Sequence, residues 1–140
     1  ASLCGIPQVV SVGAMDMVNF GPPETVPQKF KGRKFYQHNP TVTLMRTTAE
    51  ENVEIAHKLA EKLNMASGKT VLMLPLKGVS AIDVEGQPFY GPEEDAALFR
   101  TLKENVNQDV VKIEECDMAI NDPEFAEKAA KTLIQLMENH

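Results

Sequence analysis

The 140-residue sequence is poor in cysteine and in basic residues, and it contains no long apolar run. Its 14 Lys and Arg residues face 20 Asp and Glu residues, so the net charge at neutral pH is −6. Phosphate backbones require clustered Lys and Arg, and this balance therefore argues against a general nucleic-acid or membrane-surface binder. A membrane helix needs roughly 18 apolar residues in succession, and no segment approaches that length.

The only two cysteines, Cys4 and Cys116, lie far apart and lack the spacing of a metal site. We therefore expect reduced thiols and a cytoplasmic protein, with a single long-range disulfide as the alternative. Residues 1–7 lack the basic start and apolar stretch of a signal peptide. The chain begins at Ala1 and enters a strand-like run almost at once, which fits a piece of a longer protein and a processed terminus equally well.

Hydrophobic residues make up 43 % of the chain and charged residues 24 %, which is typical of one soluble domain spanning residues 1–140. A chain of this size buries roughly 68–70 % of the surface that it exposes when unfolded. It therefore needs neither disulfides nor metals to maintain a core.

Strand-like and helix-like patterns alternate along the chain. Predicted strands cover residues 9–12, 34–37, 41–45, 71–74 and 110–113, and predicted helices begin at Thr47 or Thr48, at Pro92 and at Pro123. Residues 16–32 and 76–91 are predicted to be long loops. Strands that alternate with helices favour right-handed crossovers. We therefore predict a three-layer α/β/α Rossmann-like domain with a mainly parallel sheet.

Ligands of open α/β sheets bind beyond the carboxyl ends of the strands, which directs attention to Arg46, Thr47 and Thr48. A guanidinium, two hydroxyls and the free N–H groups of a helix start together suit an anion. In the alternative interpretation, a threonine merely caps the helix and Arg46 pairs with a nearby carboxylate.

A second candidate is the turn that follows the most apolar strand, Lys77-Gly78-Val79-Ser80. Gly78 permits close backbone approach, and the side chains of Lys77 and Ser80 can hold a phosphate. The spacing is not that of a P-loop, and an ordinary turn is the alternative.

Asp16 and Asn19 stand among apolar residues on the first long loop, which indicates packing against another surface such as a second domain. The alternative is packing under the loop of this domain. His38 precedes the strand that ends at Arg46, about 16–20 Å away along an extended chain. We therefore expect His38 to be a turn residue or an interdomain contact rather than a general base. No His, Cys, Asp or Glu cluster has the spacing of a metal site.

Several motifs together carry a resemblance to a known family. They are HNPTVTLMRTTAEE at residues 38–51, LPLKGVSAID at 74–83, INDPEFA at 120–126 and the opening segment 5–21. In these segments, which keep their order over nearly the whole chain, the sequence resembles the Tm-one-like ATP-binding family. The resemblance implies two Rossmann-like halves with ATP between them. This chain would then be the C-terminal half, and its partner would be the N-terminal half.

The site residues follow from strand-end geometry, because the resemblance does not state which residues touch nucleotide. The expected nucleotide-binding residues are Arg46, Thr47, Thr48, Gly78, Val79 and Ser80. Asp16, Asn19, His38, Asn39 and Asn121 are expected to line the cleft or face the other half. Mg²⁺, where it takes part, should arrive with the nucleotide and be held through one carboxylate and waters.

Two other functions stay open at this point. One is a hydrolase or epimerase that acts on a nucleotide or nucleotide-sugar in the interdomain cleft. Its catalysis would need the other half, because this chain offers no acid–base pair within clear reach of one another. The second is a non-catalytic interaction module, which the apolar first loop and seven methionines would suit, and which could assemble as a homo-oligomer.

Overall fold

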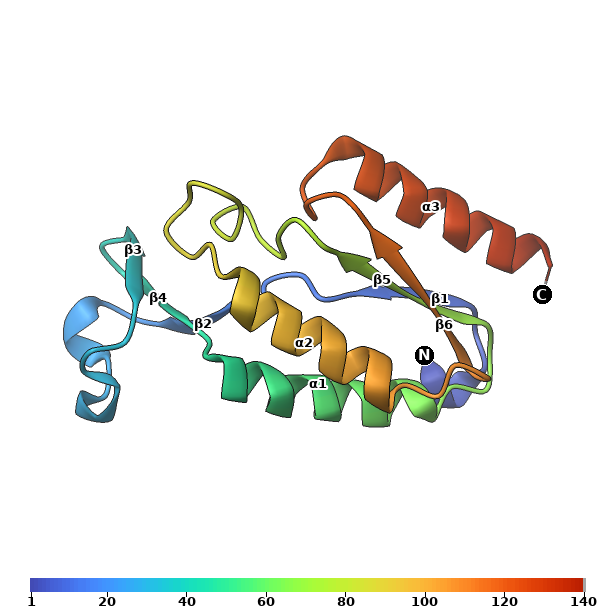
Figure 1. Cartoon of the computed structure of the whole chain (residues 1–140), viewed down its shortest axis with the longest axis horizontal. Coiled ribbons are helices and arrows are strands. Elements are labelled where there is room, and N and C mark those ends of the chain that lie inside the picture. Colours follow the sequence, from blue (N-terminus) through green and yellow to red (C-terminus); the bar gives the residue numbers. More distant parts are fainter. Residues whose placement is uncertain (140) are drawn as a thin grey trace.

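The computed structural model describes residues 1–139 and shows an α/β domain built on a parallel sheet (Figure 1). The sheet contains β1 (Gln8–Ser11), β5 (Thr70–Pro75) and β6 (Val111–Cys116) in the order β1-β5-β6. The central strand β5 is buried along its whole length, as its apolar sequence predicted.

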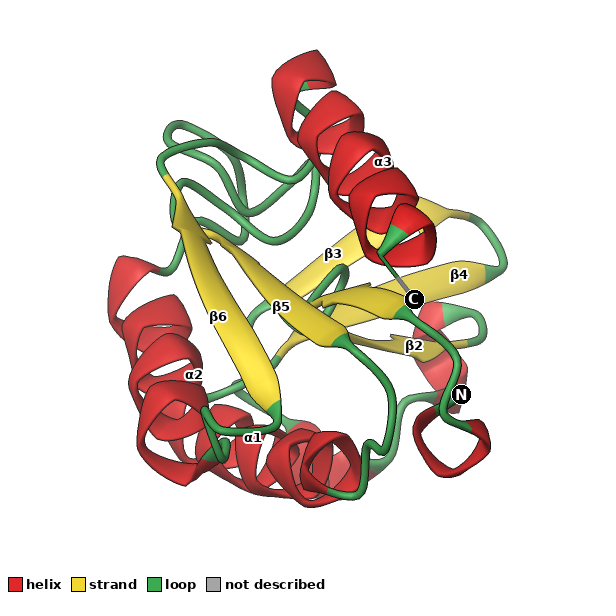
Figure 2. Cartoon of the chain, turned by 90° about the vertical axis from the view of Figure 1, so that its right-hand side faces the viewer, coloured by secondary structure: helices red, strands yellow, loops and turns green. Residues whose placement is uncertain are grey.

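Helices cover the two faces of this sheet, with α1 (Ala49–Asn64) and α2 (Pro92–Asn105) on one face and α3 (Pro123–Glu138) on the other (Figure 2). Successive residues of β5 point to opposite faces. Leu72 and Leu74 therefore share a core with α1 and α2, whereas Val71 and Met73 pack with Phe125 of α3. The three predicted helices and the α/β class are confirmed.

The start of α1 is fixed by a capping box. The Thr48 hydroxyl accepts a hydrogen bond from the Glu51 backbone N–H, and the Glu51 carboxylate accepts one from the Thr48 N–H. These two bonds satisfy backbone donors that a helix start otherwise leaves free. The sequence predicted this start correctly from the spacing of the two residues.

A second, antiparallel sheet was not predicted. It contains β2 (Met17–Phe20), β3 (Phe35–Asn39) and β4 (Val42–Arg46) in the order β2-β4-β3. The prediction of one sheet was therefore wrong for residues 41–45, which leave the parallel sheet, and the prediction of a loop was wrong for residues 17–20. In Figure 1 this small sheet lies beyond the ends of the parallel strands that are remote from the two termini.

Both cysteines are free thiols, Cys4 exposed and Cys116 buried, so the disulfide alternative is not realised in this structure. Within residues 1–139, no helix has the length and apolar character that crossing a membrane would require.

Candidate functional site

The loop that follows β1 brings the two predicted anion-binding turns to the same end of the molecule. The Asp16 carbonyl accepts a hydrogen bond from the Thr47 N–H at 2.9 Å, and the Asp16 carboxylate accepts one from the Ser80 hydroxyl at 2.6 Å. The Ala14 N–H also donates to the Val79 carbonyl at 2.9 Å. Both turns are therefore held to one loop at the carboxyl end of the parallel strands.

Arg46 is buried among groups of this chain, with 5 % of its side chain exposed. Its Nη2 lies 3.0 Å from Oδ1 of Asp83 and 2.9 Å from Oδ1 of Asp95, and its Nε donates to the Phe89 carbonyl at 2.9 Å. These contacts agree with the alternative prediction from the sequence, in which Arg46 pairs with a nearby carboxylate. Sequence reasoning missed both partners, because Asp83 looked like a loop residue and Asp95 like a charge at a helix start.

The carboxyl groups around Arg46 are unequal. Asp83 accepts hydrogen bonds from three nitrogens, those of Arg46, Gly91 and Val79. Burial, together with the adjacent Asp83 carboxyl, raises the pKa of Asp95 to about 8. Burial also raises the pKa of Asp16, against the lowering effect of the Ser80 hydroxyl. The raised pKa of Asp95 favours its protonated form at neutral pH.

The threonines that follow Arg46 are also engaged within the protein. The Thr47 hydroxyl donates to the Met15 carbonyl at 2.9 Å and accepts from the Asn52 amide at 3.0 Å. Thr48 caps α1. Together with Arg33 and Lys34, the segment Arg46–Thr48 nevertheless lines a pocket of about 220 Å³, which we call the basic pocket.

The glycine turn is shaped by its own neighbours. Gly78 has φ +147°, and a Cβ added there would overlap the carbonyl oxygen of Asp83, so only glycine fits. Val79 is fully buried. Contact of either residue with a nucleotide stays a prediction, and their visible role is to bring the Asp83 loop against the end of β5.

Three predicted residues meet in a separate hollow of about 380 Å³. Asn19 of β2, His38 of β3 and Ser80 line it together with apolar side chains. His38 and Arg46 line different pockets, in keeping with the expected separation. Asn39 instead accepts hydrogen bonds from Thr41 in its own turn. Asn121 is exposed before α3.

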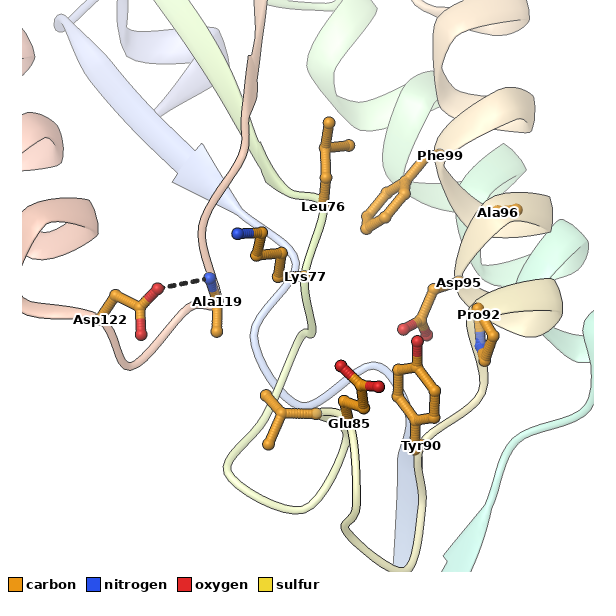
Figure 3. A pocket seen from close by; sticks show the side chains of 11 residues that line it. Leu76, Lys77, Glu85, Tyr90, Pro92, Asp95, Ala96, Phe99, Ala119 and Asp122 are labelled. Atoms are coloured by element: carbon orange, nitrogen blue, oxygen red, sulfur yellow. Dashed lines mark hydrogen bonds between the residues drawn. The ribbon is translucent and has the colours of Figure 1, made fainter.

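A hollow of about 630 Å³ lies beyond the carboxyl ends of β5 and β6, and we call it the main cleft (Figure 3). Tyr90 and Phe99 supply two aromatic rings to it, and Lys77 supplies a cation. Its acidic side chains are those of Glu85, Asp95 and Asp122. Figure 3 shows Tyr90 and Asp95 on one wall, with Lys77 across from them.

Tyr90 also lines the basic pocket, so this residue stands between the two hollows. In the basic pocket, Arg33 forms an ion pair with Glu51 at 2.5 Å and donates to the Arg46 carbonyl at 2.8 Å. The side chain of Lys34 forms no ion pair with the residues that the structure describes. Positive groups thus stand next to the acid-rich main cleft. No cluster of three or more His, Cys, Asp or Glu side chains within residues 1–139 could hold a metal ion.

This arrangement defines an α/β domain with hollows where parallel strands end, the usual place for a ligand in such folds. Residues 1–137 match the model of the uncharacterised protein family UPF0261, C-terminal domain. The chain belongs to this family.

The chain is similar to curated proteins from bacteria and a plant. It is 64 % identical over 138 residues to a UPF0261 protein of Clostridium tetani, covering 99 % of this chain and 34 % of that protein. It is 53 % identical over 125 residues to a Rhizobium meliloti UPF0261 protein, covering 89 % and 31 %. The ToMV resistance protein Tm-1(GCR237) of Solanum lycopersicum is 47 % identical over 134 residues, covering 94 % and 18 %.

These matches confirm the resemblance drawn from the motifs. The chain spans about a third of the length of the two bacterial relatives, and it corresponds to a C-terminal domain within them.

Proposed function

We propose that this chain is the nucleotide-binding C-terminal half of a two-half UPF0261 protein, with ATP as its ligand. In this proposal the helices and the sheet form a three-layer Rossmann-like unit. The observation that carries the proposal is the main cleft, which lies beyond two adjacent parallel strands and contains two aromatic rings and a lysine.

The main cleft suits the base and ribose of a nucleotide. Tyr90 is 42 % exposed, which leaves part of its side chain free to contact a base, and Phe99 adds an apolar wall. The N-terminus of α2 at Pro92 lines the same cleft and favours negative charge there.

The phosphates would begin in the main cleft and extend past Tyr90, which lines both hollows. A chain of phosphates that passes this residue reaches the basic pocket, where Arg33, Lys34 and the predicted residues Arg46–Thr48 stand. Because Arg46 is buried and Arg33 is paired with Glu51, Lys34 is the cation of the basic pocket that is most available to hold phosphate.

The acidic side chains of the main cleft suggest a role for Mg²⁺ in the binding of a triphosphate. Glu85 and Asp122 would repel a bare triphosphate, and Mg²⁺ carried by ATP reduces that repulsion. Glu85 offers the single carboxylate that such an ion needs in addition to waters and phosphate oxygens. No preformed cation cage is required for this arrangement.

Isothermal titration calorimetry with MgATP tests the proposal. We expect weak binding to the 140-residue chain and tighter binding when it is joined to the N-terminal half. Tyr90→Ala and Lys34→Ala should each weaken binding by about tenfold, the effect of about 1.4 kcal/mol. Lys131→Ala, on the exposed side of α3, should leave binding unchanged. Absence of MgATP binding to the joined halves would refute the proposal.

An enzyme that acts on a nucleotide or nucleotide-sugar, as a hydrolase or epimerase, is the second candidate. The raised pKa of Asp95, which lines the main cleft, favours it because general acids are tuned in this direction. Turnover of ATP or a nucleotide-sugar by the joined halves, lost in Asp95→Ala, would support this function over simple binding.

An interaction module is the third candidate, and the exposed side chains of Val18 and Phe35 on the small sheet favour it. The partner would be the N-terminal half or a second copy of the chain. Size measurement by light scattering distinguishes these outcomes.

Free thiols at Cys4 and Cys116 suit the cytoplasmic location that we expect.

A further inference from the structure

The charges buried around Arg46 do not balance. Asp83 and Asp95 share its Nη2 atom, at 3.0 and 2.9 Å, and the three side chains are between 0 and 7 % exposed. Asp16, fully buried, interacts electrostatically with both Arg46 and Asp83. One guanidinium therefore contacts two buried carboxyl groups and has a third, that of Asp16, in its electrostatic surroundings. An uncompensated buried charge is so costly that such groups bind protons instead.

Asp95 is the carboxyl group best placed to carry a proton to a ligand. Asp83 is held by three N–H donors and Asp16 is closed off behind Ser80. Asp95 and Asp83 contact the same guanidinium nitrogen of Arg46, yet the side chain of Asp95 lines the main cleft (Figure 3). Of the three carboxyl groups, Asp95 is therefore the one that lines the main cleft, although the neighbouring Asp83 carboxyl competes for its proton.

We propose that Asp95 contacts the ligand as a neutral carboxylic acid, donating an O–H hydrogen bond to an anionic oxygen of the nucleotide. This inference rests on the nucleotide-binding function proposed above and assigns a role to one residue of that site. A neutral acid attracts a phosphoryl oxygen through a short O–H···O⁻ bond, whereas an ionised carboxylate in the same place repels it.

The charge environment of Asp95 comes from every element around it. The titratable and charged groups are Arg46 from β4, Lys77, Asp83, Glu85 and Tyr90 from the loop after β5, Glu94 from α2, and Asp122 from the turn before α3. Acidic groups outnumber the cations, so this environment stabilises the protonated form. Loss of the proton as pH rises should expel an anionic ligand.

The experiment measures MgATP binding to the joined halves between pH 7 and 9.5, above the last phosphate ionisation near pH 6. The dissociation constant of the wild type should rise by about tenfold per pH unit once Asp95 ionises. Asp95→Asn retains an N–H donor, so its binding should be nearly independent of pH over this range. Glu93→Gln changes an exposed neighbouring acid and should keep the wild-type profile.

Carbon-13 NMR of the Asp95 carboxyl in the unliganded protein gives a second, independent readout. We expect a protonated carboxyl at pH 7 that titrates near pH 8. An ionised Asp95 at pH 7, or parallel pH profiles for wild type and Asp95→Asn, would overturn the inference while leaving nucleotide binding intact. Absence of MgATP binding to the wild type at every pH would instead overturn the proposed function itself.

Discussion

The Ser80 hydroxyl donates a 2.6 Å hydrogen bond to Oδ2 of Asp16, joining two loops whose residues are 64 positions apart. Asp16 follows the edge strand β1 and Ser80 follows the central strand β5. The bond therefore fixes the relative position of two strand ends at the rim where the main cleft and the basic pocket lie. It also occupies one oxygen of a fully buried carboxyl group.

Replacing Ser80 with alanine should destabilise the fold. Asp16 would lose its hydroxyl donor inside the protein, and an unsatisfied buried group costs about 1–3 kcal/mol. Urea denaturation followed by circular dichroism measures this loss. Ser67→Ala removes an exposed hydroxyl that bonds to Ser2 and should change stability by less than about 0.5 kcal/mol. Equal effects of the two changes would argue against a structural role for the Ser80–Asp16 bond.

Arg46→Ala should be far more damaging than loss of an exposed cation. It leaves Asp83 and Asp95 buried without their guanidinium, and breaking a buried pair costs about 3–5 kcal/mol. Lys103→Ala breaks an exposed pair with Glu115 and should cost about 0–1 kcal/mol. Chemical denaturation measures the free energy of unfolding of both variants. A loss below 1 kcal/mol for Arg46→Ala would show that the cluster does not depend on the guanidinium.

Stability should fall as pH rises from about 5 to about 8. Burial raises the pKa of Asp95 in the folded state to about 8, so between these limits the folded chain binds more protons than the unfolded chain. The free energy of unfolding then decreases with pH, and the raised pKa of Asp16 acts in the same direction.

Asp95→Asn removes the titrating group, and its stability should vary less over the same range. Thermal unfolding at a series of pH values, in buffers of matched ionic strength, provides the comparison. A wild-type midpoint that rises between pH 5 and 8 would contradict this assignment.

Gly78→Ala should disrupt the turn after β5. The new Cβ would overlap the Asp83 carbonyl, and the φ of +147° disfavours any L side chain, so we expect a loss above about 3 kcal/mol. Gly86 also has a positive φ, +86°, but open space around it, and Gly86→Ala should cost about 1–2 kcal/mol. Comparing the denaturation midpoints of the two variants separates the effect of the Cβ overlap at position 78 from the effect of the positive φ that both positions share. Equal losses would remove the packing argument for Gly78.

Short sequence patterns correctly predicted the helices and strands that are determined by interactions between residues close together in the sequence. The spacing of Thr48 and Glu51 identified the start of α1, and the apolar run around Leu72 identified the central strand. The small sheet escaped prediction because β2 pairs with β4 across a long loop, with Met17 opposite Arg46. A four-residue strand flanked by glycines and prolines carries too weak a period to reveal such a partner.

The neighbourhood of the two turns was easier to predict than their hydrogen-bond partners, and ligand binding by these turns stays a prediction. The turns that contain Arg46 and Gly78 were expected at the same rim, and both are held there by the Asp16 loop. The carboxylates that engage Arg46 lie 37 and 49 residues away in sequence, so no local spacing links them to it. Buried ion pairs of this kind depend on tertiary structure, which a single sequence does not display.

The most direct test of the account is to locate bound nucleotide by photo-crosslinking. The joined halves are irradiated with 2-azido-ATP and Mg²⁺, digested, and mapped by mass spectrometry, with excess ATP as competitor. We expect the competable label within residues 76–99, around Tyr90, because the base is proposed to lie in the main cleft. Competable label confined to α3 or to the small sheet, or no competable label at all, would contradict the central claim.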